Sequence, residues 1–120
     1  MDGFAGYFAL AHNVVQDDDA LQRGPQSVTL LKTESLRLVL VNLAAGGGLK
    51  EHSAPGGITI HCIAGAIDVQ SGQDSAHLLP GELVAMEPGV RHSVQAVEKS
   101  AFLLTIAWPG SRPSPAEMAG

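Results

Sequence analysis

The sequence is poor in cysteine, in aromatic residues and in basic residues, and each shortage excludes a class of protein. The single cysteine, Cys62, excludes an internal disulfide framework and suits a reducing compartment. Seven Lys and Arg residues against twelve Asp and Glu residues give a net charge of −5, with no basic cluster of the kind that binds nucleic acid. We therefore expect a protein that binds no nucleic acid.

Targeting signals and long apolar runs are missing as well. The opening "MDGFAGYFALAHNVV" carries Asp2 and no Lys or Arg before its apolar residues, unlike a secretory signal. No apolar run approaches the roughly 20 residues that span a bilayer. We expect a soluble, cytoplasmic protein with no membrane partner, and 120 residues suit one domain with its own core.

The sequence does contain the regularly spaced glycines and prolines that are typical of a β protein. Fourteen glycines and seven prolines separate short segments rich in Val, Ile, Leu and Thr, which is typical of an all-β sandwich or barrel. A glycine at 65 breaks or bends one long segment, and Pro80-Gly81 divides another. The predicted strand segments are 27–31, 36–45, 58–70, 76–87, 93–97 and 101–108.

The two ends of the chain differ from this pattern. Residues 1–26 are predicted to form an N-terminal extension or edge segment, in which "DDDALQRG" could form one helical turn. Residues 27–108 are predicted to form the barrel. Residues 109–120, rich in Pro, Ser and Gly, are predicted to form a flexible tail.

Alternation in "ITIHCI" assigns faces to one strand. Alternate residues share a face, so Ile58, Ile60 and Cys62 lie on one side, and Thr59 and His61 lie on the other. With the apolar set in the core, His61 points outward. We therefore expect His61 to lie outside the site that contains His52.

Glycines and histidines recur at spacings that match two linked motifs. The six matching residues are Gly46, His52, Gly65, Gly81, Gly89 and His92. On these residues the chain resembles the cupin superfamily, in particular the small, single-domain, RmlC-like bacterial cupins, many of which have no assigned activity. The resemblance implies an all-β fold, a single-domain jelly-roll β-barrel.

The chain departs from the family pattern at the metal ligands. A full cupin site holds a divalent metal with three histidines and one glutamate, and here Ala54 and Ile58 stand at two of those four positions. His52 and His92 remain as the candidate metal ligands, for iron, manganese, nickel or zinc. Two imidazoles hold a metal poorly unless water, a ligand or another residue completes the shell. Met86 could offer only a weak thioether.

Three functions are compatible with these residues. The first is binding of a small, largely apolar molecule in the barrel, with two histidines at its mouth and an apolar wall. The second is a metal-dependent, dioxygenase- or isomerase-like enzyme with an incomplete two-histidine shell. The third is a non-catalytic sensor or assembly barrel, and a homodimer through a sheet face is expected. The residues predicted to bind the ligand are His52, His92, Ile58, Ile60, Met86 and Trp108.

Overall fold

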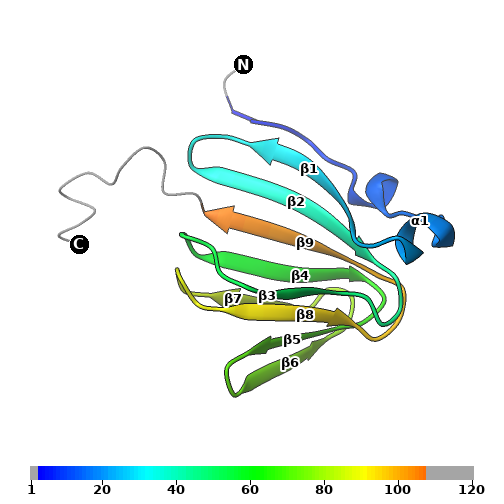
Figure 1. Ribbon diagram of the computed structural model, residues 1–120. Helices are drawn as coiled ribbons and strands as arrows, with labels where there is room; N and C mark the ends of the chain where they lie inside the picture. The colour runs from blue at the N-terminus through cyan, green and yellow to red at the C-terminus, as the bar shows by residue number, and fades with distance from the viewer. Residues whose placement is uncertain (1–2, 108–120) are drawn as a thin grey trace.

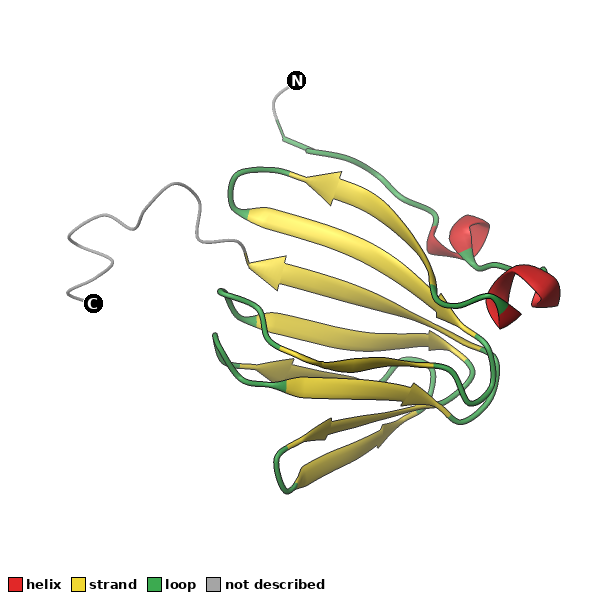
Figure 2. Ribbon diagram, in the orientation of Figure 1, coloured by secondary structure: helices red, strands yellow, loops and turns green. Residues whose placement is uncertain are grey.

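The computed structural model describes residues 3–107, and these form two antiparallel sheets with a short helical segment at one end (Figures 1 and 2). The first sheet has the strand order β1-β2-β9-β4-β7, and the second has the order β3-β8-β5-β6. The strands are β1 Gln26–Lys32, β2 Leu36–Leu43, β3 Gly48–His52, β4 Ile58–Ala64, β5 Ile67–Ser71, β6 Asp74–Leu78, β7 Leu83–Met86, β8 His92–Ala96 and β9 Ser100–Ala107.

This arrangement confirms the all-β prediction and the jelly-roll topology. The segment 58–70 splits at Gly65 into β4 and β5, and the segment 76–87 splits into β6 and β7, as the sequence predicts. One feature differs from a closed barrel. Within residues 3–107 no strand pairing joins the two sheets, since β6 and β7 belong to different sheets and diverge from their connecting loop. The molecule is a two-sheet jelly roll, and the inner faces of the two sheets enclose an inter-sheet space.

The two ends of this space are built differently. The open end, on the left in Figure 1, carries the connections 33–35, 53–57, 72–73 and 87–91. The core end, on the right, carries the connections 44–47, 65–66, 79–82 and 97–99. The buried cluster fills the space between the sheets: Val41, Leu43, Ile58, Ile60, Cys62, Ile67, Val69, Leu78, Val94, Ala96 and Phe102.

Gly65 lets the chain pass from one sheet to the other at the core end. Its φ is +79°, a backbone conformation that residues with a Cβ rarely adopt. A Cβ there would lie 2.2 Å from the carbonyl oxygen of Lys99 and 2.3 Å from the hydroxyl of Ser100. Only glycine fits this crossover without a shift of the backbone.

The N-terminal segment is attached to the first sheet through Asn42, whose side chain is fully buried. Its Oδ1 accepts from the backbone N–H of Val15 at 2.9 Å, and its Nδ2 donates to the carbonyls of Asn13 at 3.1 Å and Gln26 at 3.3 Å. The segment contains a 3₁₀ turn, Leu10–Asn13, and the helix α1, Asp18–Gln22. The predicted helical turn in "DDDALQRG" is therefore confirmed.

Asp17 caps α1 by accepting from the backbone N–H groups of Asp19 and Ala20. No helix within residues 3–107 is long and apolar enough to cross a membrane. The predicted tail 109–120 lies outside the described residues.

Candidate functional site

His52 and His92 are cross-strand partners at the open end of the second sheet. Their ring centroids lie 4.3 Å apart, with the ring planes tilted by 60°. A register shift between Leu49 and His52 places an extra residue on β3. Leu49 packs against the core, so strict alternation would turn His52 outward, and the bulge turns it inward instead.

Backbone carbonyls fix which nitrogen of each ring carries the proton. Nδ1 of His52 lies 2.8 Å from the carbonyl oxygen of Lys50, and Nδ1 of His92 lies 3.2 Å from that of Val90. A carbonyl oxygen only accepts, so each Nδ1 is the donor. In the neutral rings, both Nε2 atoms are then acceptors.

The two rings form the polar side of a cavity of about 330 Å³ between the sheets. Ser53 also lines it, and its other lining residues are apolar: Ala54, Pro55, Ile58, Leu104 and Ile106. His92 is only 2% exposed. Burial lowers the pKa of His92 below its usual value, and nearby His52 lowers it further against the raising effect of the Val90 carbonyl. His92 is therefore a neutral, buried acceptor at neutral pH.

The residues at this site do not fit a resident metal ion. Ala54 lines the cavity and Ile58 faces it, and neither side chain has a donor atom. Within residues 3–107, no group of three or more His, Cys, Asp or Glu side chains is arranged to hold a metal. Structural zinc sites take four protein ligands and catalytic ones usually take three, and two imidazoles alone fall short of both.

The predicted apolar wall is divided by the structure. Ile58 lines the histidine cavity, whereas Met86, its partner on β7, lines a neighbouring cavity. Ile60 lies one inward position deeper, is 1% exposed and packs in the core. Trp108 lies outside the described residues. Leu104 and Ile106 complete the wall of the histidine cavity, and the alternation in "LLTIA" is the signal that predicts their shared face.

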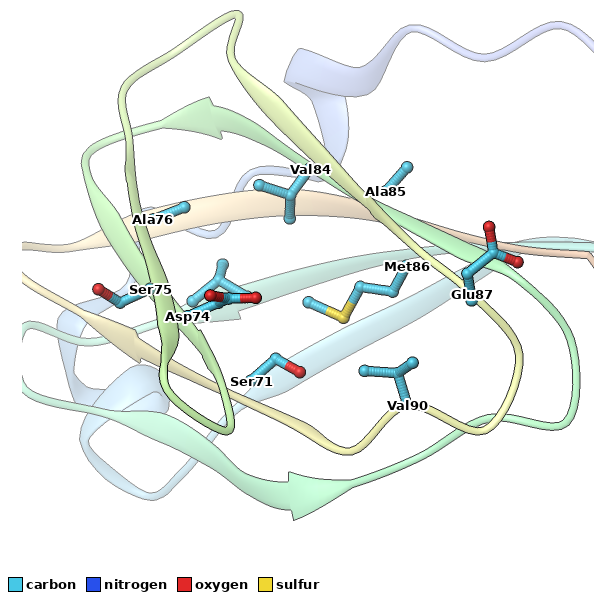
Figure 3. Close-up of a pocket in the computed structure, with 10 residues that line it drawn as sticks. Ser71, Asp74, Ser75, Ala76, Val84, Ala85, Met86, Glu87 and Val90 are labelled. Carbon is cyan, nitrogen blue, oxygen red and sulfur yellow. The ribbon is translucent and has the colours of Figure 1, made fainter.

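A second cavity, of about 290 Å³, lies between the β5–β6 hairpin and β7 (Figure 3). The side chains of Ser71, Asp74 and Met86 point toward its centre, while the carboxylate of Glu87 turns away from it. The Ser71 hydroxyl donates to the carbonyl of Arg91 at 2.9 Å. Sequence reasoning missed this cavity, because "SGQD" is typical of an ordinary hairpin turn.

The other histidines and the cysteine lie away from both cavities. His61 lies on the outer face of β4, paired with Leu83 and Leu103, as the alternation predicts. Nδ1 of His77 lies 2.6 Å from Asp68 on an exposed surface. Cys62 is fully buried, and its burial raises the pKa of the thiol, which disfavours the reactive thiolate.

Comparison with known proteins supports the fold. The structure is similar to a conserved protein of unknown function from Streptococcus pyogenes, with a TM-score of 0.75 and 24% identity over 91% of this chain and 92% of that chain. It is also similar to a cupin superfamily protein from Desulfitobacterium hafniense, with a TM-score of 0.75 and 13% identity over 88% of this chain and 94% of that chain.

A third similar structure is salicylate 1,2-dioxygenase from Pseudoaminobacter salicylatoxidans, with a TM-score of 0.65 and 18% identity. Here 70% of this chain matches 25% of the dioxygenase chain. No protein-family model and no curated protein matches the sequence. The chain has the cupin jelly-roll fold, so the resemblance that its sequence motifs indicate is confirmed at the level of the fold.

Proposed function

We propose that this protein binds a small, largely apolar molecule between its sheets, with His52 and His92 as hydrogen-bonding groups. The observation that carries the proposal is the pair of inward rings, 4.3 Å apart, in a cavity of about 330 Å³. Small-molecule sites combine an apolar lining with a few polar groups in just this way, typically in volumes of about 300–1,000 Å³.

The burial of His92 favours apolar ligands that carry a hydrogen-bond donor over those that carry none. Its Nε2 has no hydrogen-bond partner among residues 3–107, although the side chain is 2% exposed. A ligand that excludes water without offering a donor leaves this acceptor unsatisfied, at a cost of about 1–3 kcal/mol. An apolar ligand with a hydroxyl or N–H group therefore binds better than a pure hydrocarbon.

Ring-nitrogen NMR tests this proposal with 4-ethylphenol, an apolar molecule with one donor. Titration is expected to shift the Nε2 resonances of His52 and His92 and the methyl resonances of Ile58 and Ile106. His61 and His77, on outer faces, serve as internal controls and are expected not to shift. Shifts confined to the outer histidines, or none at saturating probe, contradict the proposal.

The alternative is a metal-dependent, dioxygenase- or isomerase-like activity, and a dioxygenase is among the structures of similar fold. The two-imidazole donor set argues against it. Elemental analysis of protein purified without a polyhistidine tag, as wild type, His52→Ala and His92→Ala, separates the two. Near-stoichiometric iron, manganese, nickel or zinc that is lost in both variants favours the metalloenzyme, and a metal-free protein that binds 4-ethylphenol favours the ligand-binding function.

We also propose that the chain forms a homodimer through the outer face of the first sheet. Leu83, 53% exposed, lies on that face beside its cross-strand partner His61, and Val28, 37% exposed, lies on β1 at the opposite edge of the same sheet. Among the described residues, the edge strands of this sheet, β1 and β7, also carry backbone groups without a strand partner, which a second copy of the chain can cover. In this proposal a second copy of the same chain covers the face.

A further inference from the structure

A row of polar side chains crosses the inner face of the second sheet at its open end. Ser71 pairs with Asp74 across the β5–β6 hairpin. The Gln70–Ser93 pair on the outer face places Ser71 beside His92 at the next position of the antiparallel ladder. The row is His52, His92, Ser71 and Asp74.

The facing sheet supplies one apolar wall to the whole row. Ile58, in the middle of that wall, pairs with Ile106 on one side and with Met86 on the other. Ile58 and Ile106 line the histidine cavity, and Met86 lines the cavity in Figure 3. The two cavities are therefore neighbours that share a wall.

Each member of the polar row presents an acceptor to this space. Nδ1 of His52 and of His92 donates to a backbone carbonyl, which leaves Nε2 of each neutral ring as an acceptor. The Ser71 hydroxyl donates its hydrogen bond to the Arg91 carbonyl, so only its oxygen lone pairs are left for a ligand. The Asp74 carboxylate only accepts hydrogen bonds. Among the described residues that line the two cavities, none is Lys or Arg.

We propose that the two cavities are the two ends of one binding site, and that its ligand is an organic amine with an apolar body. This inference rests on the proposed function and specifies its ligand class. The hydroxyl or N–H donor of the ligand donates to Nε2 of His52 or of His92, and its ammonium group forms an ion pair with the Asp74 carboxylate. His92 and Asp74 lie two strand spacings apart, about 10 Å, which is the span of a one-ring amine.

Three probes that share a phenol ring test this proposal: 4-ethylphenol, tyramine and 3-(4-hydroxyphenyl)propionate. They differ only in carrying no charge, an ammonium group or a carboxylate at the far end. Titration calorimetry or NMR is expected to give a Kd for tyramine about fivefold lower than for 4-ethylphenol, since Asp74 is solvent-exposed and its ion pair is screened. The propionate is expected to bind more weakly than either.

Two variants assign the preference to Asp74. In Asp74→Asn, the advantage of tyramine over 4-ethylphenol is expected to disappear, while 4-ethylphenol binds as before. Glu34→Gln is the matched control, because this substitution removes the same charge as Asp74→Asn. Glu34 lies in the exposed β1–β2 turn at the same end of the molecule. The Glu34→Gln variant is expected to keep the preference. Equal melting temperatures check that both variants are folded.

The outcomes separate this inference from the proposed function. If 4-ethylphenol shifts His52 and His92 but tyramine gains nothing, the amine class is wrong and the ligand-binding function stands. If the propionate binds as tightly as tyramine, or Glu34→Gln loses the preference like Asp74→Asn, the role of Asp74 is overturned. If no probe shifts the two histidines, both proposals fail.

Discussion

The core end and the open end of the sandwich use the same strands for opposite purposes. At the core end, the inward positions of β5, β6 and β8 carry Ile67, Leu78 and Ala96, which are 0–5% exposed. At the open end the same three strands carry Ser71, Asp74 and His92, β3 adds His52, and two cavities lie beside these side chains. A change at the core end should therefore alter stability, and a change at the open end should alter binding.

Phe102→Ala gives the largest expected effect at the core end. Phe102 is fully buried among the strands of both sheets, and its removal leaves a cavity that costs about 3–5 kcal/mol of the free energy of unfolding. Urea denaturation followed by fluorescence or circular dichroism measures it. A loss below about 1 kcal/mol would mean that the core end is not the tightly packed part of the molecule.

Two glycines with positive φ compare the ends directly. Gly65 (φ +79°) lies at the core end, where a Cβ would meet backbone, and Gly72 (φ +59°) lies in the β5–β6 turn, where a Cβ would meet nothing within 4 Å. Gly72→Ala is expected to cost about 1 kcal/mol from the backbone alone. Gly65→Ala is expected to cost clearly more. Equal melting temperatures for the two variants would contradict the close approach at Gly65.

The buried His92 predicts that stability falls as the pH falls. Its pKa in the folded protein lies below 6.5, so below pH 6.5 the unfolded chain takes up a proton that the folded His92 does not. Stability that is fully present above pH 6.5 is therefore lost progressively between 6.5 and the lowered pKa. In His92→Gln, the decline in melting temperature from pH 7 to pH 5 is expected to be smaller by a few degrees. An unchanged pH dependence would show that His92 is solvated in the folded state.

His52→Ala is expected to change binding more than stability. His52 is half-buried at the mouth of the cavity, and its loss is expected to cost less than about 1 kcal/mol of stability. The affinity for 4-ethylphenol is expected to fall several-fold, because one of two acceptors is gone. His61→Ala, on the outer face, is the control that leaves affinity unchanged. A strong loss of stability with unchanged affinity would place His52 in the core rather than the site.

The proposed homodimer gives the smallest change in the fold itself. Leu83 is 53% exposed on the outer face of β7, so Leu83→Glu leaves the inter-sheet space untouched. Light scattering at several concentrations is expected to show a dimer for the wild type and a monomer for Leu83→Glu. A wild type that remains monomeric, or a dimer that Leu83→Glu leaves intact, contradicts the proposed interface.

Much of the fold could be predicted from local sequence signals. The glycine and proline punctuation predicts β strands, and the break at Gly65 and the division at Pro80-Gly81 occur as predicted. The inward set Ile58, Ile60 and Cys62 follows from alternation because the side-chain period in a strand is two. The cupin motif spacing also predicts that His52 and His92 belong together, and their rings are in contact.

Other features depend on contacts that are remote in sequence. The bulge on β3 turns His52 inward, and no local pattern in "GLKEH" predicts that extra residue. Ser71 and Asp74 look like turn residues until strand pairing places them beside His92. The apolar wall also differs, since Ile60 lies deeper than predicted and Ile106 takes part in the site.

The sequence by itself determined the strands, their apolar faces and the pair of histidines, because alternation and turn chemistry act over a few residues. The tertiary structure alone decided which side chains share the space between the sheets and which nitrogen of each imidazole ring is free to accept a hydrogen bond. It also decided that the polar row continues from His92 to Asp74. The physical reason is that register between strands is fixed by the packing of both sheets together, with residues 20–50 positions apart in the chain becoming neighbours.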